Sequence, residues 1–210
     1  MATLEEEIKN ALVELKKDNP RKFNQTVELI VNLQKFDVRK ESLNIFVSVP
    51  HKIKDKKICA FLTTKSKIID TITEEEFKRY SDKKELKKLE KKYDFFISQA
   101  ILMPKVATTF GRALGPSGKM PSPQLGILPS TDEKLINELR EKINNSIRIR
   151  SKEASIKLAV GKQNMDEKDL LENIITIYHA LLKNFAKGKE NIKNVEVKLT
   201  MSKPVKILSK

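Results

Sequence analysis

The side chains that could carry catalytic chemistry are few and scattered along this chain of 210 residues. The only histidines are His51, beside lysines in a predicted loop, and His179, inside an apolar helical pattern. No cysteine, serine or carboxylate is spaced along the sequence to act with His51, and His179 is expected to be a satisfied core or boundary residue. Cys59, the single cysteine, lies in an apolar strand pattern, which favours a packed and unreactive thiol. We therefore predict no catalytic site, no metal site and no cofactor.

A glycine-rich segment from Gly111 to Met120 is the strongest candidate for an enzyme-type site, because backbone amides in such a loop can bind phosphate. Its spacing differs from a P-loop, since no glycine lies five residues before Gly118 and a methionine follows the lysine where Ser or Thr is required. The segment also follows a predicted helix, 106–114, and not the first strand of a dinucleotide-binding unit. We favour a stiff connector, and keep nucleotide binding through the Gly115–Gly118 loop as the alternative function.

The balance of charge favours nucleic acid as the partner. The chain has 42 Lys and Arg against 28 Asp and Glu, a formal net charge of +14. Residues 1–53 hold nine basic and eight acidic side chains, residues 54–145 hold 19 and 13, and residues 146–210 hold 14 and seven. A polyanion site should therefore involve the C-terminal segment. The lysine run 83–92 has leucines at helical spacing, which favours an ordinary solvated helix face.

Composition excludes several other classes of protein. Hydrophobic residues make up 39% of the chain, too many for a disordered protein. No apolar run approaches the roughly 20 residues that span a bilayer, so we expect no membrane segment. The N-terminus is acidic and amphipathic, unlike a signal peptide, and the single cysteine fits a reducing cytosol.

Hydropathy patterns at the two ends of the chain predict one shared domain. An amphipathic helix within 4–15 precedes an alternating strand from Phe23 to Leu33, whose inward face begins with Phe23, Gln25 and Val27. The other predicted elements are strands at 45–49, 147–149, 156–160 and 195–201, and a long helix at 166–185. Neither end alone has enough apolar surface for a core. We expect residues 1–53 plus 146–210 to form one discontinuous antiparallel-sheet α/β domain.

The central segment, 54–145, follows a different pattern. Short apolar strands at 58–62 and 93–97 alternate with helices that begin after Thr73 and Ser130 and with the helix at 106–114. This order predicts a compact α/β unit with a largely parallel sheet, inserted as a second domain. The fold class is therefore α/β with two domains.

The chain resembles the ribosomal protein L-one family, the protein of the mobile stalk of the large ribosomal subunit, in its archaeal form. Four segments carry the resemblance, which extends through essentially the whole chain: Lys22 to Leu29, Tyr93 to Ile97, Leu114 to Pro121 and Leu199 to Met201. It implies a first domain built from both termini and an inserted Rossmann-like domain. It also implies direct binding of large-subunit rRNA, chiefly by the first domain.

The family's RNA-contacting positions carry over one by one to eight residues: Lys22, Phe23, Thr26, Glu28, Lys152, Thr200, Met201 and Ser202. Ser202 replaces the usual glycine, which puts a close backbone approach to RNA at that point in doubt. Thr26 and Glu28 alternate with the inward Val27, so they belong to the solvent face, where an ordinary polar sheet surface is the alternative interpretation. A carboxylate or hydroxyl there can accept a hydrogen bond from a ribose 2′-OH. Lys152, Lys198 and Lys203 would attract phosphates, and Phe23 could stack on a base or pack in the core.

The resemblance has further implications for partners and location. The protein is expected to contact tRNA in the exit site and assist its release, and to repress translation of its own mRNA. We expect a cytoplasmic, ribosome-bound protein that is a monomer when free and has no membrane partner. Besides the nucleotide-binding alternative, a basic protein that binds DNA by charge alone remains open.

Overall fold

The computed structural model describes residues 4–17, 21–38, 41, 43–151 and 153–209. The chain divides into two compact units, one from Met1–Lys54 with Asn145–Lys210 and the other from Asp55–Asn144. We call them the discontinuous unit and the inserted unit.

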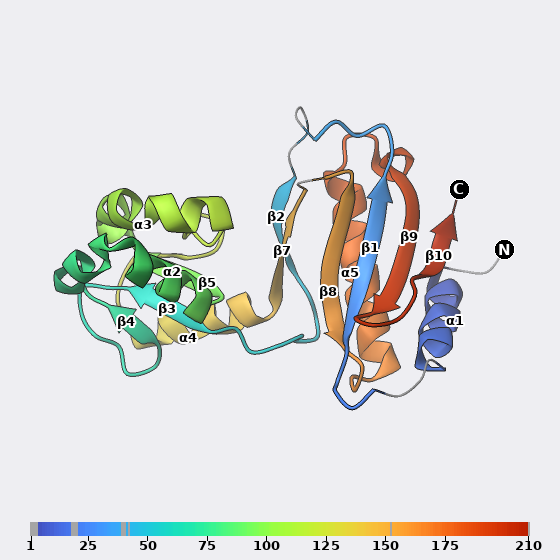
Figure 1. Cartoon of the computed structure of the whole chain (residues 1–210), viewed down its shortest axis with the longest axis horizontal. Helices are drawn as coiled ribbons and strands as arrows, with labels where there is room; N and C mark the ends of the chain where they lie inside the picture. Colours follow the sequence, from blue (N-terminus) through green and yellow to red (C-terminus); the bar gives the residue numbers. More distant parts are fainter. Residues whose placement is uncertain (1–3, 18–20, 39–40, 42, 152, 210) are drawn as a thin grey trace. The chain divides into compact units, whose positions relative to one another are not determined.

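The discontinuous unit is built on an antiparallel sheet in the order β10-β9-β1-β8 (Figure 1). These strands are β1 (Thr26–Leu33), β8 (Ser155–Lys162), β9 (Ile192–Leu199) and β10 (Val205–Ser209). Buried and half-buried residues alternate along β1, because one sheet face packs on helices and the other is open. The covering helices are α1 (Leu4–Lys16) and α5 (Glu167–Asn184), whose apolar residues join those of the sheet in one core.

Two further strands, β2 (Asn44–Ser48) and β7 (Ser146–Arg150), form a separate antiparallel pair within this unit. Their buried residues, including Val47 and Ile149, join the same core. A short 3₁₀ helix, η3 (Gly188–Asn191), follows α5 and precedes β9.

The inserted unit has a parallel sheet in the order β4-β3-β5-β6. Its strands are β3 (Ile58–Phe61), β4 (Asp70–Ile72), β5 (Phe95–Gln99) and β6 (Ile127–Leu128). One sheet face packs on η1 (Glu74–Ser81), α2 (Lys83–Lys92) and α3 (Met103–Ser117), with η2 (Ala100–Leu102) leading into α3. The other face packs on α4 (Glu133–Asn144).

The structure confirms the predicted class, with an antiparallel sheet from both ends of the chain and a separate parallel sheet between them. Among the described residues, none of the helices has the length and apolar character needed to cross a membrane.

Several predicted boundaries were wrong; for example, the strand expected at 93–97 runs from Phe95 to Gln99. The strand expected to start at Phe23 begins at Thr26, so Phe23 lies outside the sheet and is exposed. The helix expected at 106–114 runs from Met103 to Ser117, through two glycines and Pro116. The last strand ends at Leu199, and Pro204 precedes a further strand, β10, that the sequence pattern did not show.

Candidate nucleic-acid interface

Three segments meet at one end of the antiparallel sheet (Figure 1). Because β1 runs antiparallel to both of its neighbours, its first residues lie beside their last ones. Thr26 is paired with Lys162 of β8, and Val27 with Leu199 of β9. We call residues 22–28, 162–165 and 198–203 together the sheet-end surface. It brings together seven of the eight predicted RNA contacts, and the eighth, Lys152, lies outside the described residues.

Thr26 and Thr200 continue the β1–β9 pairing beyond the end of β9. The Thr26 amide donates to the Thr200 hydroxyl at 3.1 Å, and the Thr200 amide donates to the Thr26 carbonyl at 3.1 Å. The Thr200 hydroxyl in turn donates to the same carbonyl at 3.3 Å. Its proton and one lone pair are thus used within the protein. The geometry assigns Thr200 a positioning role for the segment that carries Met201.

Gln25 is the buried centre of this end of the sheet, and sequence reasoning missed its role. Its side chain is 3% exposed, and its Oε1 accepts the Met201 amide at 3.1 Å. Its backbone carbonyl accepts the Gln163 amide at 2.9 Å. One residue therefore ties both neighbouring loops to β1. The sequence did contain an indication of this role, because Gln25 is a polar residue on the apolar face of the predicted strand.

The loop after β8 adds two more polar links. Lys162 Nζ donates to the Thr26 hydroxyl at 2.8 Å, and Asn24 Nδ2 donates to Asn164 Oδ1 at 2.8 Å. Gly161, near the end of β8, lets the strand pack closely on α5, because an added Cβ would lie 2.3 Å from Leu170 Cδ2. Neither Lys162 nor Asn164 was predicted, because only the fold brings them next to β1.

Two large apolar side chains project into solvent from this surface. Phe23 is 53% exposed and Met201 is 61% exposed, and together they make half of the exposed large hydrophobic residues in the described chain. This settles Phe23 as a surface residue and not a core residue. Exposed apolar groups on a hydrogen-bonded framework are suited to contact a base or ribose face.

The remaining predicted contacts border these groups. Lys22 is exposed, and Glu28 is half-buried on the open face of β1, in register with Lys198. Ser202 has no left-handed backbone conformation, so this position does not require glycine for its own φ. Its hydroxyl accepts the Leu199 amide at 2.8 Å and so closes the turn after β9.

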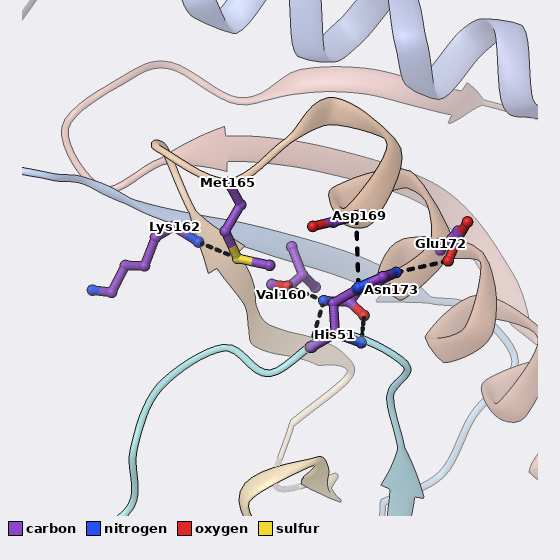
Figure 2. Close-up of polar contacts among 7 residues, drawn as sticks. All are labelled: His51, Val160, Lys162, Met165, Asp169, Glu172 and Asn173. Atoms are coloured by element: carbon purple, nitrogen blue, oxygen red, sulfur yellow. Dashed lines mark hydrogen bonds and ion pairs between the residues drawn. The ribbon is translucent and has the colours of Figure 1, made fainter.

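His51 has carboxylate partners, contrary to the expectation from its sequence neighbours. Figure 2 shows its ring between two residues of α5, with Nε2 2.7 Å from Glu172 Oε2 and Nδ1 3.6 Å from Asp169 Oδ1. Buried Asn173 accepts the His51 amide at 3.1 Å and donates to the His51 carbonyl at 3.0 Å. It also donates to the Val160 carbonyl at 3.0 Å. This arrangement anchors the segment after β2 to α5.

The glycine-rich segment lacks the geometry of a phosphate loop. Gly111 and Gly115 lie within α3, and Gly118 ends the helix with a φ of 74°. The segment is therefore at a helix C-terminus, whose partial negative charge disfavours phosphate. Lys119 Nζ donates to the carbonyls of Glu90 at 2.7 Å and Tyr93 at 2.9 Å, so it serves the fold. These contacts do not support nucleotide binding there.

The other candidate groups of the sequence show no catalytic geometry. Cys59 is fully buried in β3, and burial raises the pKa of its thiol to about 12. His179 is exposed on α5. Within the described ranges, no group of three or more His, Cys, Asp or Glu residues is arranged to hold a metal ion.

Comparison with known proteins gives a consistent result over nearly the whole chain. The sequence profile of the ribosomal protein L1p/L10e family matches residues 15–203. A protein of Nanoarchaeum equitans is 34% identical over 198 residues, covering 90% of this chain and 93% of the relative. Proteins of Pyrobaculum arsenaticum and Thermofilum pendens are 37% and 38% identical, covering 92% and 98% of this chain and 89% and 92% of the relatives. Each of the three is named large ribosomal subunit protein uL1.

Proposed function

Because the chain belongs to the ribosomal protein L1p/L10e family, we propose that it is a constituent of the large ribosomal subunit that binds large-subunit rRNA through the sheet-end surface. The discontinuous unit is the main RNA-binding part in this proposal. The protein acts as a structural component and not as an enzyme.

The exposure of two apolar side chains on ordered segments is the observation that best supports RNA binding at the sheet-end surface. Phe23 and Met201 are exposed on segments that the Gln25 and Thr200 hydrogen bonds hold in place. Stacking or apolar contact with RNA loses little entropy when the protein groups are already ordered. Lys22, Lys198 and Lys203 at the same surface add attraction for phosphates without sequence preference.

Glu28 gives the surface a means of selecting RNA by shape. A carboxylate repels phosphate but accepts hydrogen bonds from a ribose 2′-OH or a base amino group. A site that combines this acceptor with apolar groups favours folded RNA over a regular DNA duplex.

The proposal extends to the ribosomal stalk and to two further RNAs. On the resemblance of the sequence, the bound protein forms the mobile stalk, contacts tRNA in the exit site and assists its release. By the same reasoning it represses translation of its own mRNA through an RNA site that imitates the rRNA.

The test is competition binding of the full chain to large-subunit rRNA transcribed from the same genome. We expect preference over small-subunit rRNA and over duplex DNA that persists at 0.3 M salt, where binding by charge alone falls steeply. Equal binding to all three nucleic acids would leave only a charge-driven interaction and would refute the proposal.

A further inference from the structure

The inserted unit has a groove between two helices that the proposed rRNA site does not use. It has a volume of about 810 Å³ and lies between α2 and α3. From α2 it is lined by Lys83, Leu86, Lys87 and Glu90, whose spacing places them on one helix face. The residues of α3 that line it include Thr108, Arg112 and Ser117.

Three cations of the groove have no ion-pair partner within the described part of the chain. Lys83, Lys87 and Arg112 are all exposed, and none forms a salt bridge there, whereas nearby Lys88 is paired with Glu85 at 2.7 Å. Among the described residues that line the groove, Glu90 is the one acidic residue. Three cations against one carboxylate leave the described lining of the groove with a net positive charge, which favours an anionic ligand.

Two hydroxyl groups of the groove, those of Thr108 and Ser117, already donate their protons within the protein. Thr108 Oγ1 donates its proton to the Lys105 carbonyl at 2.9 Å, and Ser117 Oγ donates to the Ala113 and Leu114 carbonyls, each at 3.1 Å. Since each hydroxyl has one proton, what remains for a ligand are lone pairs. The Glu90 carboxylate also offers only acceptors. A ligand that carries hydrogen-bond donors beside its negative charges can therefore use these acceptors as well as the cations.

We propose that the α2–α3 groove binds an RNA backbone and forms a second RNA contact of the protein. Phosphates lie against Lys83, Lys87 and Arg112, while ribose 2′-OH groups donate to Glu90, Thr108 and Ser117. An acidic peptide fits less well, because its carboxylate side chains bring no donor of their own, and only its backbone N–H groups could meet the acceptors of the groove. The proposal rests on the proposed function, since rRNA is the RNA in question.

The test compares two triple variants of the full chain. The groove variant is Lys83→Gln, Lys87→Gln and Arg112→Gln. The matched control is Lys134→Gln, Arg140→Gln and Lys142→Gln on α4, which packs on the other face of the same sheet. Each variant loses two lysines and one arginine from exposed positions, so the change in net charge is the same. Thermal unfolding should show that both variants are folded.

Binding to in vitro transcribed large-subunit rRNA is then measured between 0.1 and 0.4 M salt. Each lost phosphate contact lowers the salt slope by about one. The groove variant loses three cations, so we expect the slope to fall by about three and binding at 0.1 M salt to weaken at least about tenfold. The control should stay within about twofold of the parent.

Equal effects of the two triple variants would overturn the groove site, and the proposed function would still stand if the parent chain binds rRNA selectively. Failure of the parent to bind rRNA would overturn both. A poly-glutamate peptide serves as a second probe. If it binds the parent and this binding is lost in the groove variant, while rRNA binding is unchanged, the groove is a peptide site and the RNA proposal is wrong.

Discussion

The substitution Gln25→Met removes the link between β1 and the turn that carries Met201. Methionine matches glutamine in length and fits an apolar setting, but it has no oxygen to accept the Met201 amide. The site is 3% exposed, so water does not readily replace the lost acceptor. We expect the free energy of unfolding to fall by about 1–2 kcal/mol, the usual cost of leaving such a donor without a partner.

The effect on RNA binding follows from the same lost bond. Without it, the backbone around Met201 becomes mobile in the free protein, and ordering one residue again on binding costs about 1–2 kcal/mol. That cost corresponds to an increase of about five- to thirtyfold in the Kd for large-subunit rRNA. No charge changes, so the salt dependence of binding should stay the same.

Gln34→Met is the matched control, because Gln34 follows the opposite end of β1. Its side chain donates to the carbonyls of Glu190 at 3.0 Å and Ile192 at 3.2 Å, so its loss should also destabilise the fold. Filter binding should show an unchanged Kd for this variant, and urea denaturation should show a loss of stability in both. If Gln25→Met destabilises the protein but leaves the Kd unchanged, or if Gln34→Met weakens binding equally, the reasoning about the turn is refuted.

Three further predictions concern other parts of the discontinuous unit and the core of the inserted unit. Thr200→Val removes both hydrogen bonds between the Thr200 side chain and the Thr26 backbone, and should weaken rRNA binding by about 1–2 kcal/mol with little change in the salt slope. A large change of the salt slope in a filter-binding series would show an electrostatic role instead. Asn173→Leu removes the buried bonds that hold the His51 backbone and should lower the free energy of unfolding by about 3 kcal/mol in urea, and a loss below about 1 kcal/mol would contradict that anchoring role. Burial raises the pKa of the Cys59 thiol from 9.0 to about 12. The contribution of the neutral thiol to stability is complete below pH 9. It is lost as the pH rises toward 12, because the thiol of the unfolded chain ionises in this range and the buried thiol does not. A thiol reagent at pH 8 should label Cys59 only after denaturation, and rapid labelling of the folded protein would show that the thiol is accessible.

Local patterns predicted the elements whose burial follows a simple period. The alternation along β1 and the apolar runs of β3 and β5 could be recognised in the sequence, because each strand buries one face or both. The sequence pattern also placed Gln25 on the apolar face of the predicted first strand, although it did not show what Gln25 does there. A buried polar side chain requires a partner, and the pattern does not show which one.

The missed features depend on contacts between distant parts of the chain. His51 meets α5 more than one hundred residues later, and Lys162 reaches Thr26 from a separate strand. Gly115 and Pro116 led to the prediction that the helix observed as α3 ends near Leu114. Instead, Leu114 is fully buried, and the helix continues until Gly118 adopts a left-handed conformation. Tertiary packing therefore outweighed the local helix-breaking tendency at Gly115 and Pro116.

The most direct measurement of the central claim is ultraviolet crosslinking of the full chain bound to large-subunit rRNA, followed by mapping of the crosslinked peptides. We expect crosslinks in residues 22–28 and 198–203, where Phe23 and Met201 are exposed. Crosslinks found elsewhere in the chain, with none in these two segments, would contradict it.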